Sequence, residues 1–358
     1  MKEQLKTLKP YQPGKQVEEV KKELGLEKIE KLASNENPFG CSPKAIKGMQ
    51  KVFGELAIYP DGYATVLRKK ISAHFHISED QIIFGNGTDE IIHMISRAYL
   101  EPGLNTIMAD LTFPQYKRNA VIDGAEVREV PLVHGRHDLD TMRSLIDENT
   151  KVIWLCNPNN PSGEYIRESE LTAFLDTVPS DVLVVSDEAY YEYVTAEDYP
   201  QSLNLIQSYP NLIFTRTFSK AYGMAALRIG YGIANPELIR SLEAVREPFN
   251  ASRLAQAAAA EALEDQEFIA KCAEKNNEGK QQYYDFCDDM GLACYPTQGN
   301  FILIDVGGSG EEAFKYLLSK GYIVRSGAAL GYPKGIRITI GNKEQNDAII
   351  SHLRNYLT

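Results

Sequence analysis

Short apolar segments alternate with helical segments between residues 81 and 215, and this alternation constrains the possible folds more than any other feature of the chain. Helical stretches such as Glu90–Leu100 and Glu168–Leu175 separate most of the apolar segments. Repeated βα units predict an α/β fold whose mostly parallel sheet lies between helices and binds ligands beyond the carboxyl ends of its strands. The expected strands are Gln81–Phe84, Thr106–Ala109, Glu126–Val130, Val152–Leu155, Val182–Ser186 and Leu212–Thr215.

The remainder of the chain predicts an arm and a second, smaller unit. Prolines and glycines surround one helical segment, Val17–Leu24, in residues 1–40, which favours an arm that packs on another part of the molecule. Residues 41–250 are expected to form a large domain that begins with helices at Ser42–Phe53 and Ala64–His74. Residues 251–358 predict a long linking helix, Ser252–Met290, and a small α+β domain. Its expected strands are Phe301–Asp305, Tyr322–Arg325 and Ile336–Ile340, and its expected helices are Glu311–Ser319 and Lys343–Tyr356.

Composition limits the classes of partner. The net charge of −11 argues against nucleic acid or anionic lipid, which require a basic face. No apolar run approaches the roughly 18 residues of a membrane span, and the first residues lack the apolar core of a signal peptide, so we expect a cytoplasmic protein. The five cysteines and six histidines show neither a C-x-x-C pair nor an H-E-x-x-H motif, so we expect free thiols and no metal site.

Lys220 lies in the loop Thr217-Phe-Ser-Lys, directly after an expected buried strand. A lysine amine forms an imine with a carbonyl group, and partial desolvation near other cations lowers its pKa enough to make it nucleophilic. Arg228 follows eight residues later and can clamp an anion. A lone loop lysine is more often an ordinary surface residue, so a functional role requires partners from other segments.

The segment Gly85-Asn-Gly-Thr-Asp-Glu90 follows a strand and opens a helix. The backbone N–H groups of residues 87–89 and the hydroxyl of Thr88 can therefore hold a phosphate at the positive end of that helix. A dinucleotide-binding fingerprint is disfavoured because Glu90 replaces its third glycine. An ordinary helix capped by Thr88 or Asp89 fits the pattern equally well.

Other polar or aromatic residues also follow strands. A carboxylate at the position of Asp187 can pair with a protonated heterocycle, and Tyr190 can donate a hydrogen bond into the same crevice. For Glu188 the pattern favours a simple turn-capping role. Asn157 suits either a turn or the site, and Phe113 suits either the core or a flat ring on which it stacks.

A phosphate cradle, a ring-stacking aromatic, a ring-nitrogen carboxylate and an imine-forming lysine together make up a site for pyridoxal 5′-phosphate. The order of the motifs resembles fold-type I pyridoxal-phosphate-dependent aminotransferases over nearly the full chain. These motifs are Gly85-Asn-Gly-Thr-Asp, Asn157-Pro-Asn-Asn-Pro-Ser-Gly, Asp187-Glu-Ala-Tyr, Thr217-Phe-Ser-Lys and Leu227-Arg-Ile-Gly-Tyr. Within that family the chain is most similar to the histidinol-phosphate aminotransferases, through Pro10-Tyr-Gln-Pro-Gly, Leu32-Ala-Ser-Asn-Glu-Asn-Pro-Phe-Gly, Tyr59-Pro-Asp-Gly, Ile323-Val-Arg-Ser-Gly and Ile336-Arg-Ile-Thr-Ile-Gly.

The resemblance implies a role for each matching residue. Lys220, Asp187 and Tyr190 would be catalytic: Lys220 would form the imine with the cofactor, Asp187 would hold its ring nitrogen, and Tyr190 with Asn157 its phenolic oxygen. Phe113 would cover one face of the ring. The phosphate would be held by Gly87, Thr88, Asp89, Thr217, Ser219 and Arg228. Tyr59 would reach the phosphate of a neighbouring subunit, which implies a homodimer. Substrate would meet Tyr11, Asn35, Arg325 and Arg337, with the two arginines binding its anionic group.

The implied reaction is transamination of L-histidinol phosphate with 2-oxoglutarate, giving imidazole acetol phosphate and glutamate in histidine biosynthesis. The alternatives within the fold are an aromatic aminotransferase for phenylalanine and tyrosine, and a threonine-phosphate decarboxylase. Ser326-Gly-Ala-Ala, which follows Arg325, departs from the family pattern and bears on the choice of substrate. A pyridoxal-phosphate-binding regulator is disfavoured, since the chain is acidic and shows no basic helix-turn-helix.

Overall fold

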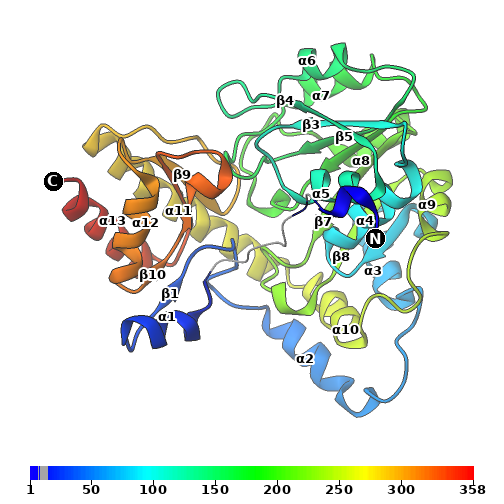
Figure 1. Ribbon diagram of the computed structural model, residues 1–358. Helices are drawn as coiled ribbons and strands as arrows, with labels where there is room; N and C mark the ends of the chain where they lie inside the picture. Colours follow the sequence, from blue (N-terminus) through cyan, green and yellow to red (C-terminus); the bar gives the residue numbers. More distant parts are fainter. Residues whose placement is uncertain (7, 9–14) are drawn as a thin grey trace.

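The computed structural model describes residues 1–6, 8 and 15–358. A large unit built on a seven-stranded sheet stands beside a smaller unit built on a three-stranded sheet (Figure 1). The predicted α/β class is confirmed, with a mostly parallel sheet between helices and a smaller α+β unit.

The large sheet has the strand order β2-β8-β7-β6-β5-β3-β4. Neighbours from β7 to β4 are parallel, whereas β8 runs antiparallel to both β7 and β2. The strands are β2 (Ile82–Gly85), β3 (Asn105–Ala109), β4 (Glu126–Val130), β5 (Thr150–Cys156), β6 (Leu183–Asp187), β7 (Leu212–Thr217) and β8 (Gly230–Ala234).

Strand β8 is absent from the strands expected from the sequence, because glycine is depleted in strands. Close packing explains its two glycines. A Cβ at Gly230 would lie 2.8 Å from the backbone nitrogen of Thr88, and one at Gly232 would lie 3.1 Å from Ile213. The glycines of β8 therefore allow its neighbours to approach closely.

Successive residues of the central strands are buried on opposite faces of the sheet. In β6, Val184 belongs to one apolar cluster while Leu183 and Val185 belong to the other. One face is covered by α4 (Thr88–Tyr99), α5 (Gln115–Asp123) and α9 (Pro236–Glu243). The other is covered by α3 (Thr65–Phe75), α6 (Leu139–Ser144), α7 (Glu168–Leu175), α8 (Ser202–Ser208) and α10 (Arg253–Ala262). A fully buried Leu, Ile or Val contributes about 1.5–3 kcal/mol to such a core.

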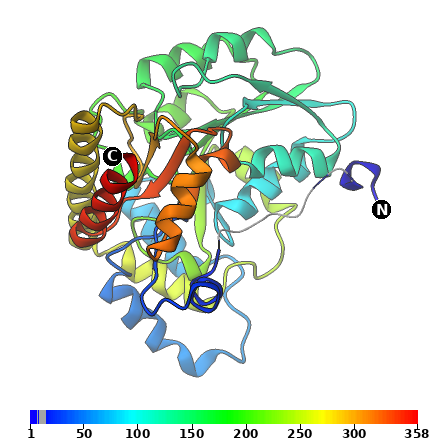
Figure 2. The same cartoon turned by 60° about the vertical axis from the view of Figure 1, so that its left-hand side comes forward.

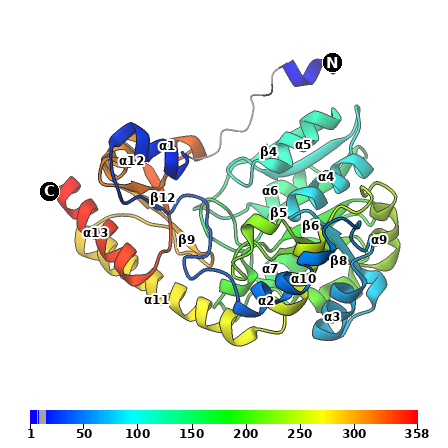
Figure 3. The same cartoon turned by 90° about the horizontal axis from the view of Figure 1, so that it is seen from below.

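The predicted helix Ser252–Met290 is two helices, since helical structure is interrupted between α10 and α11 (Gln266–Met290). The alanines of α10 pack on α2 (Pro43–Lys51) in the large unit. Helix α11 then runs from the large unit to the small one (Figure 3) and lies beside α13 (Lys343–Leu357) there (Figure 2). The division into domains at residue 250 stays a prediction, and α10 lies on the large-unit side of it.

The arm packs on the small unit. Its strand β1 (Glu30–Lys31) pairs in parallel with β10 (Tyr322–Ile323), and Val20 of α1 (Val17–Leu24) is buried against Ile323. The small sheet has the order β11-β12-β9, and α12 (Gly310–Ser319) packs against it. Its strands are β9 (Phe301–Asp305), β11 (Arg325–Ser326) and β12 (Gly335–Thr339). None of the described helices combines the length and apolar character needed to cross a membrane.

Glu188 does not cap a turn, which corrects the interpretation from the sequence. Its carboxylate is fully buried and accepts hydrogen bonds from Arg216 at 2.9 and 3.0 Å and from the hydroxyls of Ser186 and Ser202. The guanidinium of Arg216 lies 3.3 Å from the ring centroid of Tyr191. This buried ion pair lies next to Asp187, directly beneath the edge of the sheet where the polar motifs gather.

We expect Glu188→Ala to lower the free energy of unfolding by about 3–5 kcal/mol, because it leaves the buried charge of Arg216 without its partner. Denaturant titration measures this loss. The matched control is Glu237→Ala, which removes the partner of Arg240 from an exposed ion pair and should change stability by less than about 1 kcal/mol. Equal effects of the two substitutions would contradict the importance of the buried pair.

Candidate active site

A cavity of about 620 Å³ lies between the two units, at the carboxyl ends of the parallel strands. Asp187 enters it from the end of β6, and Lys220 from the loop after β7. Arg325 and Arg337 reach it from the sheet of the small unit. A cavity of this size is typical of small-molecule sites.

The loop that carries Lys220 begins and ends at the same edge of the sheet. Strand β7 ends at Thr217, and β8 returns from Gly230 antiparallel to it, so the connecting residues stay at the carboxyl ends of the strands. Both Lys220 and Arg228 belong to this connection. The antiparallel strand that sequence reasoning missed therefore places two predicted site residues together.

The amine of Lys220 loses its proton more readily than that of an ordinary lysine. Burial, reinforced by the positive charge of Arg337, lowers the pKa of Lys220 to about 8. Its Nζ donates a hydrogen bond to the backbone oxygen of Ser34 at 3.1 Å and lies 5.8 Å from the ring centroid of Tyr190. In these surroundings a larger share of the lysine amine is unprotonated, and therefore nucleophilic, than in water.

Asp187 is a buried carboxylate with donors on both oxygens. The hydroxyl of Tyr116 donates to Oδ2 at 2.6 Å, and that of Thr215 donates to Oδ1 at 3.0 Å. Burial raises the pKa of Asp187 to about 6, while the two hydrogen bonds act in the opposite direction. The carboxylate is therefore ready to pair with a cation that enters the cavity.

An anion cradle surrounds the N-terminus of α4. Gly87 caps this helix at φ +79°, and a Cβ there would lie 2.4 Å from the guanidinium of Arg228. Arg228 donates to the hydroxyl of Ser219 at 3.2 Å and pairs with Asp89 at 3.3 Å. Thr88 and Thr217 also line the cavity. The helix end, the hydroxyls and the arginine suit a phosphate group.

The small unit supplies two arginines that oppose one another. Arg325 and Arg337 are directly paired across the antiparallel strands β11 and β12. Like charges in such positions repel each other, and an anionic ligand between them would relieve the repulsion. Arg337 also donates to the side-chain oxygen of Asn160 at 2.6 Å and to the backbone oxygen of Ala33 at 2.7 Å.

Tyr190 and Asn35 are held together at the cavity. The side-chain amide of Asn35 donates to the hydroxyl of Tyr190 at 3.0 Å, while Thr339 donates to the side-chain oxygen of Asn35 at 3.2 Å. Phe113, two residues before α5 begins, also lines the cavity. These three predicted site residues therefore meet Lys220 and Asp187 in one place.

The predicted contact of Asn157 with a ligand is not supported. Its side chain is fully buried and forms two hydrogen bonds with the backbone of Ile166. It accepts one from the nitrogen of Ile166 at 2.8 Å and donates one to the oxygen of Ile166 at 3.4 Å. Asn160, three residues later in the same motif, lines the cavity instead. The repeated Asn-Pro of Asn157-Pro-Asn-Asn-Pro gave no local signal to distinguish the two asparagines.

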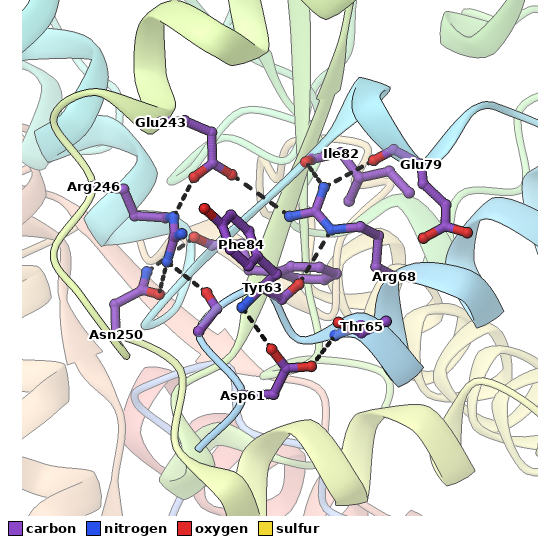
Figure 4. A network of polar contacts seen from close by, with 11 residues as sticks. Asp61, Tyr63, Thr65, Arg68, Glu79, Ile82, Phe84, Glu243, Arg246 and Asn250 are labelled. Carbon is purple, nitrogen blue, oxygen red and sulfur yellow. Dashed lines mark hydrogen bonds and ion pairs between the residues drawn. The ribbon is translucent and has the colours of Figure 1, made fainter. Parts of the chain in front are cut away.

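Tyr59 lies outside the cavity of its own chain, with 76% of its surface exposed. Its ring stacks on Phe249, with centroids 4.7 Å apart. The segment that carries it is fixed to the large unit, since Arg253 donates to the backbone oxygen of Tyr59 and Arg246 donates to that of Gly62. Figure 4 shows Arg246 with its partners Glu243 and Asn250 beside this segment. Tyr11, the remaining predicted site residue, is outside the described residues.

This set of groups fits a phosphorylated heterocyclic aldehyde such as pyridoxal phosphate. The cradle at Gly87 matches the phosphate, the carboxylate of Asp187 matches a protonated ring nitrogen, and the amine of Lys220 matches a carbonyl carbon. The opposed arginines leave room for a second, anionic molecule.

Comparisons with known proteins agree with this chemistry. A family model described as "Aminotransferase class I and II" matches residues 27–353. The chain is 61% identical over 358 residues to the histidinol-phosphate aminotransferase of Bacillus subtilis (strain 168), a match that covers 100% of this chain and 99% of that protein.

Solved structures match over similar lengths. The crystal structure of histidinol-phosphate aminotransferase from Sinorhizobium meliloti in complex with pyridoxal-5′-phosphate has a TM-score of 0.90 at 28% identity, covering 100% of this chain and 97% of that one. The L-threonine-O-3-phosphate decarboxylase from Porphyromonas gingivalis has a TM-score of 0.79 at 24% identity, covering 92% and 99%. At that identity the second likeness shows the fold alone.

We expect the amine of Lys220 in the ligand-free protein to react with a small acylating reagent with a rate midpoint near pH 8, because its neutral form predominates above its pKa of about 8. The pKa of an ordinary lysine is about 10.4. Peptide mass spectrometry follows the labelling. Arg337→Ala removes a nearby positive charge and should move the midpoint to higher pH; a midpoint that does not move would contradict the electrostatic contribution of Arg337.

Proposed function

Because the chain belongs to the aminotransferase class I and II family, we propose that it transfers the amino group of L-histidinol phosphate to 2-oxoglutarate with pyridoxal phosphate as its cofactor. The products are imidazole acetol phosphate and glutamate, and the reaction is a step of histidine biosynthesis. The observation that carries the proposal is the meeting of Lys220, Asp187 and the cradle of Arg228 in a single cavity. The identity of 61% to the Bacillus subtilis enzyme supports the choice of substrate. A cytoplasmic location stays a prediction from the sequence.

Separate groups of residues would hold the parts of the cofactor. The N-terminus of α4, Ser219, Thr217 and Arg228 would bind its phosphate, and Asp187 its ring nitrogen. Phe113 would cover one face of the ring. Tyr190 would bind the ring hydroxyl, and Asn160 takes over the role expected of Asn157, because its side chain lines the cavity. When bound, pyridoxal phosphate supplies a conjugated ring that accepts electron density from the substrate carbon.

Lys220 has two tasks in this proposal. Its amine would hold the cofactor between turnovers, and its Nζ would take the proton from the substrate carbon that carries the amino group. The lowered pKa of about 8 suits both tasks, because the neutral amine is available at physiological pH. The Ser34 carbonyl and the Tyr190 ring limit the positions that the amine can occupy.

Arg325 and Arg337 would bind the anionic group of each substrate. The phosphate of histidinol phosphate and a carboxylate of 2-oxoglutarate would occupy the same place in alternate half-reactions. Since the arginines lie on paired strands, they present a wide positive surface rather than a single charge. That arrangement tolerates two anions of different size.

A homodimer completes the site in this proposal. Apolar side chains are exposed along one stretch of the large unit and at Phe249, which stacks on Tyr59. These are Phe53, Leu56, Ile58, Tyr59, Tyr63, Val66 and Phe249. Such a contiguous exposed apolar set is typical of an interface. A second copy would cover it, and Tyr59 would then reach the phosphate of the partner's cofactor.

We expect kcat/KM with 2-oxoglutarate to be highest for histidinol phosphate, because only this donor combines an anion for the two arginines with an imidazole. Phenylalanine, tyrosine and phosphothreonine form the comparison set. Keto product and released carbon dioxide are both measured. Preference for phenylalanine or tyrosine would favour the aromatic aminotransferase, and carbon dioxide from phosphothreonine would favour the decarboxylase. Failure of every donor would contradict the proposed reaction.

We expect Tyr59→Ala and Lys220→Ala homodimers to be nearly inactive, whereas a mixed dimer of the two regains about half of the wild-type activity. In the mixed dimer, one site combines Lys220 of the first subunit with Tyr59 of the second. The loss of a hydrogen bond to a charged phosphate should cost Tyr59→Ala about tenfold or more.

The control is a mixture of Lys220→Ala with Lys220→Arg, which has no intact site in any pairing. If Tyr59 served its own chain, the first mixture would show no more than the residual activity of Tyr59→Ala alone. Gel filtration of each mixture establishes that dimers are present.

A further inference from the structure

Tyr116 is a buried tyrosine behind the cavity that none of the sequence motifs singled out. It lies in the first turn of α5 and is fully buried. Its ring stacks on Trp154, with centroids 5.0 Å apart and planes 11° apart. The edge of Phe113 meets it at 5.6 Å and 75°. Packing on both neighbours restricts the position of the ring.

The hydroxyl of Tyr116 is aimed at the carboxylate of Asp187. It donates to Oδ2 at 2.6 Å, and Thr215 donates to Oδ1, so each oxygen of the carboxylate receives one protein donor. Burial and the charge of Asp187 raise the pKa of Tyr116 well above its ordinary value. The phenol therefore stays protonated and acts as the donor in this bond.

A carboxylate with these surroundings depends on its donors to remain charged. Asp187 is 3% exposed, so water cannot compensate for a lost hydrogen bond. Without Tyr116 the equilibrium would shift toward the neutral acid, and a neutral acid cannot pair with a protonated ring nitrogen.

We propose that Tyr116 is a positioning residue: its hydroxyl keeps Asp187 ionised and turned into the cavity, so that Asp187 holds the ring nitrogen of pyridoxal phosphate in its protonated form. The inference rests on the proposed function. Because Tyr116 also contacts Phe113, the same side chain fixes the residue that covers the ring and the residue that binds its nitrogen.

The test is a comparison of two ligands in the wild type and in Tyr116→Phe. The first ligand is pyridoxal phosphate, and the second is the analogue in which carbon replaces the ring nitrogen. Each is titrated into protein freed of cofactor, and binding is followed by the fluorescence of Trp154, the one tryptophan of the chain. Phenylalanine preserves the ring contacts with Trp154 and Phe113, so the fold should survive.

The variant should bind pyridoxal phosphate about tenfold more weakly than the wild type does, because it loses a hydrogen bond to a charged group. Its affinity for the analogue should change by less than about twofold, since the analogue has no nitrogen for Asp187 to hold. Thr215→Val should produce the same selective loss through Oδ1.

The wild-type affinity for pyridoxal phosphate should fall as the pH drops through about 6, where Asp187 takes up its proton. In Tyr116→Phe that midpoint should move to higher pH, because losing a hydrogen bond to the carboxylate raises the pKa of Asp187.

Tyr283→Phe is the matched control. Tyr283 is also fully buried, and its hydroxyl has no hydrogen-bond partner among the described residues. It lies in α11 of the small unit, so the substitution should leave both affinities unchanged.

Equal losses for the two ligands in Tyr116→Phe would mean that Tyr116 only supports the fold, and unchanged affinity for both would mean that Asp187 does not need it. Either result overturns the inference while the proposed function stands. A wild-type protein that binds neither ligand would overturn the proposed function itself.

Discussion

The cost of burying charge governs this molecule from the core of the large unit to the cavity. Glu188 and Arg216 are both almost completely buried and compensate one another beneath the sheet edge. One residue before Glu188, Asp187 forms no ion pair with any of the described residues and is stabilised by two hydroxyl groups instead. Burial shifts the pKa of Asp187 up and that of Lys220 down, so the two groups are closer in proton affinity than they would be in water. A ligand that supplies the missing charges completes the arrangement.

Most of the cavity could be predicted from the sequence because it depends on local position. Lys220, Asp187 and Thr88 each follow an apolar strand, and parallel strands bring their carboxyl ends to one edge whatever the loops do. The choice between Asn157 and Asn160 depends on the path of a loop, and both asparagines precede a proline. Tyr116 gave no signal, because a tyrosine in the first turn of a helix looks like an ordinary core residue until the strand carrying Asp187 is placed beside it.

Two larger features of the fold could not be predicted from the sequence, for similar reasons. The glycines of β8 hid this strand from the sequence analysis. Atoms of other elements, including the backbone of Thr88, leave no room for a Cβ there, and the sequence does not show that these atoms are close. The break between α10 and α11 separates two continuous helical patterns, and only packing on α2 in the large unit distinguishes the first from the second. Sequence periodicity therefore identified the elements better than it identified which unit each one joins.

The pairing of β1 with β10 makes the small unit discontinuous along the chain. Its core includes Leu32 from the arm and Tyr283 from α11, which are separated in sequence by nearly the whole large unit. A graft that replaced the small unit with that of a relative would have to exchange both segments together. A transplant of the carboxyl-terminal third alone would leave β10 beside a strand selected for a different neighbour. A stable chimaera of two related chains should therefore take both ends from the same parent.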